Sequence, residues 1–260
     1  MLQKRFFYLI KIQYLGYRFH GWQKQPKLKT VQFMIDRTLK FIFEGKTFKT
    51  LGAGRTDAMV SANETALELF TYHEIEDLEV FLNLFNFNLP QDIRALGINE
   101  VDENFNVIQN PKVKEYHYVF SEGQKNHPFC APILTTILEP LNVDLMKQGA
   151  LLFKGEHNFK GYCFRATDNG QYIRTILDSE IIDNDIYVAN FFPSKSYVFK
   201  VKGKGFMRNQ IRLMFGELIK LGRGDIDLQH IENSLKPEST DVMDYIAPAS
   251  GLILHSVDFE

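Results

Sequence analysis

Hydrophobic and polar residues follow two regular spacings in the first hundred residues. In residues 5–14, Phe6, Tyr8 and the apolar residues that follow recur at every second position, which predicts a β-strand. Apolar residues at spacings of three and four predict an amphipathic helix over residues 31–42, with Thr30 as its N-cap. The same two spacings predict strands at 47–51, 65–70 and 93–100 and a helix at 76–87. The order strand, helix, strand, strand, helix, strand is that of a ferredoxin-like unit.

The remainder of the chain repeats this alternation of strands and helices more loosely. Strands are predicted at residues 112–120, 173–182, 186–192, 196–201 and 252–259, and helices at 143–153, 206–221 and 227–235. In the helix expected at 206–221, Arg208 and Arg212 are four residues apart and would be neighbours on one face.

No long linker interrupts the pattern, which therefore predicts an α+β fold made of two ferredoxin-like (RRM-like) halves. The expected halves are residues 1–106 and 107–260, and they would share one continuous, mainly antiparallel sheet with a central cleft.

Composition places the chain among ordinary globular proteins. Of its 260 residues, 45% are hydrophobic and 24% are charged, and the start of the chain has neither a signal peptide nor an apolar run long enough to span a membrane. We therefore expect a cytoplasmic protein without membrane contact. Cys130 and Cys163 are the only cysteines and lack zinc-site spacing, so we expect free thiols and no metal.

The net charge of −2 excludes a uniformly basic nucleic-acid binder, but basic residues are concentrated locally. One concentration is formed by Lys46, Lys49 and Arg55. The loop at 14–26 also mixes aromatic and basic residues around Trp22, which fits RNA binding. The alternative is a loop that packs Phe19 and Trp22 into the core. A second concentration runs from Lys200 to Arg223.

The segment from Gly52 to Ala62 is the best candidate for a catalytic loop. Two glycines are followed at once by a cation, a hydroxyl and a carboxylate, namely Arg55, Thr56 and Asp57. The strands expected on either side would hold the carboxylate rigidly. The alternative is a turn in which Asp57 caps its own backbone.

Seven collinear motifs resemble those of the TruA-type tRNA pseudouridine synthases over nearly the whole chain. They are G-R-T-D-A around Asp57, G-W-Q-K-Q followed by T-V-Q at Thr30, N-L-P-Q-D-I at Asn88, K-E-Y-H-Y around Tyr116, Y-I-R-T-I from Tyr172, G-K-G-F-M-R-N-Q-I-R from Gly203, and A-P-A-S-G-L-I-L near the C-terminus. The resemblance implies an isomerase without a cofactor that detaches uracil from its ribose, turns it and rejoins it through carbon.

The resemblance also implies a role for each matching residue. Asp57 is the expected catalytic carboxylate, acting as a nucleophile or as a base, and Arg212 is the cation that pairs with it. Tyr116 would pack on the target base, and Arg55 would replace the flipped nucleotide in the RNA stack. The residues expected to contact RNA are Arg18, Trp22, Gln23, Lys24, Arg55, Lys204 and Arg208.

The implied substrate is tRNA, with the target uridine in the anticodon stem and loop, and the implied assembly is a homodimer. The chain departs from the family pattern at Met59 and Ser61, where glycine and histidine are usual, and at 105–109, where a basic residue is expected. Another structured RNA such as rRNA is the alternative substrate. A glycoside hydrolase would need a second carboxylate, and an RNA-binding protein without activity would not need Asp57.

Overall fold

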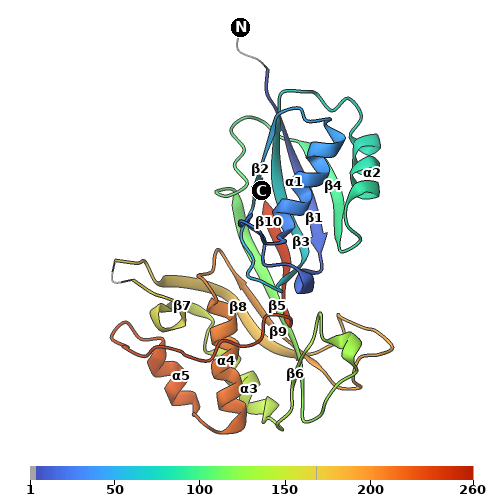
Figure 1. Cartoon of the computed structure of the whole chain (residues 1–260). Helices are drawn as coiled ribbons and strands as arrows, with labels where there is room; N and C mark the ends of the chain where they lie inside the picture. Colours follow the sequence, from blue (N-terminus) through green and yellow to red (C-terminus); the bar gives the residue numbers. More distant parts are fainter. Residues whose placement is uncertain (1–3, 168, 260) are drawn as a thin grey trace. The chain divides into compact units, whose positions relative to one another are not determined.

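A computed structural model describes residues 4–167 and 169–259 of the chain. The fold divides into two compact units, of which the first is formed by Met1–Lys112 together with Leu254–Glu260 and the second by Val113–Ile253. The chain passes between them twice, within β5 (Pro111–Glu122) and within β10 (Leu252–Phe259) (Figure 1). The first unit is therefore made of two stretches of sequence, and the second unit is inserted between them.

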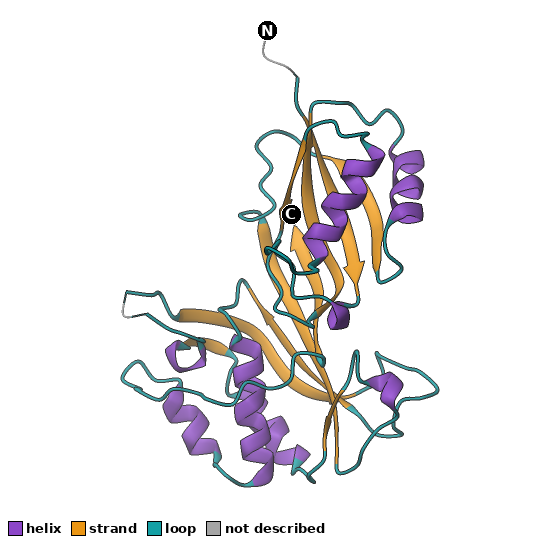
Figure 2. Ribbon diagram, in the orientation of Figure 1, coloured by secondary structure: helices purple, strands orange, loops and turns teal. Residues whose placement is uncertain are grey.

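The first unit is an antiparallel sheet with two helices on one face (Figure 2). Its elements are β1 (Phe6–Tyr14), α1 (Val31–Ile42), β2 (Phe48–Gly52), β3 (Ser61–Thr71), α2 (Leu78–Asn88) and β4 (Ile93–Glu100), followed much later by β10. The strand order is β4-β1-β3-β10, and β2 also pairs with β3. Each predicted strand and helix of this region is confirmed within a few residues.

The apolar residues whose spacing predicted β1 and α1 are largely buried in the core. Tyr8, Ile10 and Ile12 of β1 are almost completely buried, so one side of the strand faces the core. The Thr30 hydroxyl accepts a hydrogen bond from the Phe33 N–H and caps α1 as predicted. Each fully buried aliphatic side chain contributes roughly 1.5–3 kcal/mol to stability.

The second unit has a four-stranded antiparallel path, β5-β9-β8-β7, and a short strand β6 that runs parallel to β5. Its further elements are β6 (Thr135–Ile137), α3 (Val143–Leu151), β7 (Gly155–Asn158), β8 (Ile173–Asp183), β9 (Tyr197–Gly203), α4 (Gln210–Arg223) and α5 (Leu228–Ser234). Phe215 of α4 packs on β5, with its ring centroid 4.0 Å from that of Tyr118 and 4.8 Å from that of Phe120. This aromatic cluster joins the helix to the sheet.

Residues 186–192 do not form the predicted strand. They lie in an irregular connection between β8 and β9, where the Asn184 side chain accepts from the N–H of Tyr187 and donates to its carbonyl oxygen, both over 2.9 Å. This local bonding replaces a sheet ladder, and Pro193 has no N–H to donate to one. The short strands β6 and β7 were not predicted.

The protein is therefore α+β with a mainly antiparallel arrangement of strands, as predicted. Among the helices of residues 4–167 and 169–259, none is long and apolar enough to cross a membrane.

Candidate active site

Asp57 lies on the loop between β2 and β3, two strands that pair directly with each other. The ladder extends to Gly52 opposite Leu67, and the Ala53 N–H continues it by donating to the Ala66 carbonyl oxygen over 2.9 Å. The loop is thus anchored at both ends by sheet, as the sequence predicted. Asp57 is half-buried and Arg55 is exposed.

The loop that follows β1 supports the Asp57 loop through its backbone. The Trp22 N–H donates to the Thr56 carbonyl oxygen over 3.1 Å, and the Met59 N–H donates to the Phe19 carbonyl oxygen over 3.0 Å. Gly21 makes this approach sterically feasible, because its φ is +86° and a Cβ there would lie 2.7 Å from the same Thr56 oxygen. Asp57 therefore sits between two bonds that fix its neighbours.

Trp22 supports the loop from inside the core. It is only 4% exposed, and a side chain at Gly52 would collide with its indole ring. The Phe19 side chain is equally buried. The structure thus favours a loop that packs Phe19 and Trp22 in the core, and the Trp22 ring has no exposed face on which an RNA base could stack.

The Thr56 hydroxyl adds a side-chain link beside Asp57. Its Oγ1 lies 2.7 Å from the hydroxyl of Tyr14, the last residue of β1. The same Tyr14 ring lies 5.9 Å from the Trp22 ring. The residue that precedes the carboxylate is therefore tied to the central strand of the sheet.

Met59 and Ser61, the two departures from the family pattern, affect the loop in different ways. Met59 has a φ of +67°, in the left-handed region that favours glycine. The Ser61 Oγ accepts a hydrogen bond from the buried Gly16 N–H over 2.9 Å. Ser61 thus satisfies a backbone donor of the supporting loop, whereas Met59 introduces backbone strain next to the site.

Three residues expected to contact RNA in the first unit have different environments. Arg18 donates twice to one carboxylate oxygen of Asp92, at 2.9 and 2.6 Å, and Lys24 forms an ion pair with Asp36. Gln23 is exposed. The two cations already have carboxylate partners, which reduces what each could contribute to an RNA phosphate.

Tyr116 lies in β5 of the second unit, opposite Val201 of β9. Its ring is half-buried and meets the Phe206 ring edge-on, with the centroids 5.2 Å apart. Phe206 belongs to the loop between β9 and α4, so this contact fixes the tyrosine against the segment that leads to Arg212.

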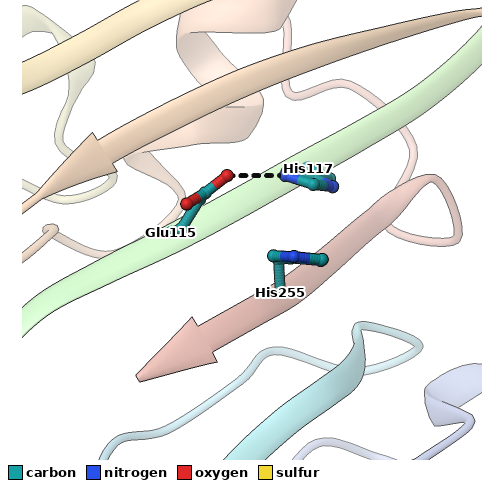
Figure 3. A group of neighbouring side chains, drawn as sticks. All are labelled: Glu115, His117 and His255. Atoms are coloured by element: carbon teal, nitrogen blue, oxygen red, sulfur yellow. Dashed lines mark hydrogen bonds and ion pairs between the residues drawn. The ribbon is translucent and has the colours of Figure 1, made fainter. Parts of the chain in front are cut away.

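Residues on the opposite face of the same strand form a polar network that the sequence did not predict. The Nε2 atom of buried His117 lies 2.9 Å from Glu115 Oε1 (Figure 3). The other ring nitrogen lies 2.9 Å from the Tyr187 hydroxyl. Burial, followed by the charge of Glu115, raises the pKa of Tyr187, which therefore stays protonated at neutral pH. The available signal was the spacing of Glu115 and His117, which are two residues apart and therefore lie on one face of the predicted strand.

The helix that carries Arg212 begins at Gln210, four residues later than predicted. Asn209, with a left-handed φ of +58°, precedes it, and the Gln210 side chain accepts from the Met207 N–H over 2.9 Å, so the preceding segment is a closed loop. The prediction that Arg208 and Arg212 are neighbours on one helix face was wrong, because Arg208 lies in this loop.

Arg212 is half-buried and held by its own unit. Its Nε donates to the Ala247 carbonyl oxygen over 2.7 Å, and its Nη1 donates to Asn209 Oδ1 over 3.2 Å. A guanidinium fixed at two nitrogens presents its remaining N–H groups in a set direction. Lys204 and Arg208 are both exposed.

Cys130 and Cys163 are free thiols. Burial raises the pKa of both, so neither is a reactive thiolate at neutral pH.

Comparison with known proteins identifies the family. A family model described as tRNA pseudouridine synthase matches residues 150–260, which include Arg212. The chain is 30% identical over 254 residues to tRNA pseudouridine synthase A of Streptococcus agalactiae serotype Ia, covering 97% of this chain and 95% of the relative. It is also 30% identical over 256 residues to the protein of that name from Pseudothermotoga lettingae, covering 98% of this chain and 100% of the relative. The chain belongs to the tRNA pseudouridine synthase A family.

Proposed function

We propose that the protein isomerises uridine to pseudouridine in tRNA. The observation that carries this proposal is the half-buried Asp57 of G-R-T-D, on a loop held by β2 and β3 and by the backbone of Gly21 and Trp22. It occurs in a chain similar over 97% of its length to a tRNA pseudouridine synthase A.

The reaction is a rearrangement within one nucleotide, so it needs no oxidant, reductant or cofactor. The bond between the ribose C1′ and the uracil N1 breaks, a bond from C1′ to the uracil C5 forms, and the hydrogen lost from C5 is balanced by the one gained at N1. We assign to Asp57 the role of the reactive carboxylate. It would attack C1′ as a nucleophile or remove a ribose proton as a base.

The other roles follow from residue chemistry and from the family resemblance. We propose that Arg212 pairs with Asp57 and keeps it ionised, and its two fixed nitrogens support this role. The Tyr116 ring, held by Phe206, is proposed to pack on the target uracil. Arg55, exposed beside Asp57, is proposed to occupy the space of the flipped nucleotide.

The target within tRNA is proposed to be a uridine of the anticodon stem and loop. The test is to incubate the purified protein with unmodified tRNA and unmodified ribosomal RNA and to locate pseudouridine by primer extension after carbodiimide treatment. We expect stops in the anticodon arm of tRNA. Stops confined to ribosomal RNA would refute the substrate, and RNA binding without any stops would support a noncatalytic RNA-binding protein.

We further propose that the chain comprises two ferredoxin-like halves, 1–106 and 107–260, with the RNA bound in a cleft that both line. The strand order β4-β1-β3, with β2 on β3 and a helix after β1 and after β3, supports this for the first half.

A cytoplasmic homodimer is proposed from the family resemblance. Light scattering should give twice the 30.2 kDa chain mass at working concentration. A monomer mass together with full activity would contradict the homodimer.

A further inference from the structure

Phe164 of the second unit lies against two arginines from separate segments. The guanidinium carbons of Arg165 and Arg208 each lie 5.1 Å from the centroid of the Phe164 ring. The Phe164 N–H donates to the Arg208 carbonyl oxygen over 3.1 Å, which joins the segment before β8 to the loop before α4. One half-buried ring and one backbone bond therefore hold two cations, each 5.1 Å from the same ring centroid.

The two charges have no acidic counterpart in the part of the chain that the structure describes. Both arginines are exposed, and neither has a carboxylate oxygen within 4.0 Å among residues 4–167 and 169–259. In contrast, Arg18 and Arg223 contact Asp92 and Glu139 at 2.6 and 3.0 Å. Two guanidinium groups beside the same phenyl ring repel each other, and an anion bound by both would offset that repulsion.

The backbone is strained at or next to each of the two arginines. Arg165 itself has a φ of +58°, and so does Asn209, the residue after Arg208. Residues other than glycine rarely adopt this conformation, and where they do the surrounding structure enforces it, often at functional sites. Both segments that contribute an arginine therefore contain a residue in a conformation that the surrounding structure must enforce.

We propose that Arg165, Phe164 and Arg208 form an RNA-backbone clamp, in which the two guanidinium groups bind one phosphodiester of the substrate. Planar guanidinium groups bind phosphate oxygens through paired N–H donors, and the ring keeps both planes in position. The clamp is connected to Arg212 of the proposed site. Asn209, the residue after Arg208, accepts a hydrogen bond from the Arg212 side chain. This inference rests on the proposed function, since it takes the ligand to be RNA.

Salt dependence of binding tests the clamp directly. The affinity for an unmodified tRNA transcript would be measured over a range of salt concentrations for four proteins: the wild type, Arg165→Gln, Arg208→Gln and the double variant. Each phosphate contact contributes about 0.7–0.9 to the slope of log K against log salt, so the double variant should lose about that amount. Because both arginines hold one phosphate, the second substitution should weaken binding less once the first is present.

Arg223→Gln is the matched control for each single variant, because it removes one positive charge from the same unit at a side chain that is already paired with Glu139. We expect wild-type slope and affinity for it. Equal slopes and affinities in the double variant and in Arg223→Gln would overturn the proposal. Strictly additive losses would also overturn it, because they indicate two separate contacts.

Phe164→Leu tests the ring without changing charge, and its affinity should fall toward that of the double variant. Unchanged affinity in this variant would refute the role of the ring. Pseudouridine formation by the wild type separates the two proposals. If the wild type forms none in tRNA, the proposed function fails, whereas pseudouridine formation combined with unchanged binding in the double variant refutes the clamp alone.

Discussion

Arg212 and Ala247 are bound to each other in both directions. The Arg212 Nε donates to the Ala247 carbonyl oxygen over 2.7 Å, and the Ala247 N–H donates to the Arg212 carbonyl oxygen over 3.2 Å. The A-P-A-S-G motif near the C-terminus thus orients a side chain 35 residues earlier in the sequence. The family motif around Arg212 and the one at Ala247 therefore form a single structural feature.

Replacing Arg212 with Lys should keep the positive charge but lose the planar group that bonds to Ala247 and Asn209 at the same time. We expect kcat for pseudouridine formation to fall by about tenfold or more, equivalent to about 1.4 kcal/mol in the barrier. Tritium release from uridine labelled at C5 measures the rate. Arg223→Lys, at the other end of α4, is the control and should retain full activity. Wild-type kcat in Arg212→Lys would show that charge alone suffices.

Asp57→Asn should abolish the reaction, because the amide keeps the shape of the side chain but has no charge with which to attack or to accept a proton. We expect the rate to fall by at least about a thousandfold, while the melting temperature and tRNA affinity stay near those of the wild type. The exposed Asp225→Asn is the charge-matched control. Residual turnover of more than a few per cent would remove Asp57 from the catalytic role.

The hydrogen bond between the hydroxyls of Tyr14 and Thr56 should contribute to stability. Tyr14→Phe and Thr56→Val each remove one hydroxyl of a 2.7 Å hydrogen bond, and each should cost about 1 kcal/mol of unfolding free energy. The double variant should lose less than the sum of the two, because the same bond is removed twice. Urea unfolding measures all three variants. Additive losses would mean that the two hydroxyls do not interact in solution.

Glu68 should make stability depend on pH. The side chain is almost fully buried in β3, and desolvation raises its pKa, although the Val107 N–H and the charge of Lys49 oppose the change. A carboxyl whose pKa is higher in the folded state binds its proton more tightly there. Its unfavourable contribution is therefore absent below the ordinary pKa of glutamate, develops as the pH rises to the folded-state pKa and persists above it.

Glu68→Gln should remove this dependence and still offer an acceptor to the Val107 N–H, which lies 3.1 Å from the carboxylate. Urea midpoints of the two proteins should converge at acidic pH, and the variant should gain relative to the wild type as the pH rises. Parallel pH profiles would show that Glu68 titrates normally.

Local sequence signals predicted the elements whose own residues determine them. Helix α1 has its cap and its apolar stripe in one window, and β10 begins with a short apolar run, so both were predicted closely. The start of α4 was predicted too early, because the apolar spacing continues upstream to Phe206. The left-handed backbone of Asn209 prevents the helix from beginning before Gln210. Trp22 was ambiguous because residues distant in sequence, such as Gly52, surround it in the core.

The two-stretch composition of the first unit has a consequence for synthesis on the ribosome. Strand β10 follows β3 in the sheet order, and the Asn63 side chain donates to the His255 carbonyl oxygen over 3.4 Å, yet these residues are translated after the whole second unit. Domains usually fold in the order in which they emerge. Here the first unit cannot complete its sheet until the last residues of the chain have been translated. Until then, the edge of β3 that pairs with β10 has unpaired backbone groups and could pair with a strand of another chain.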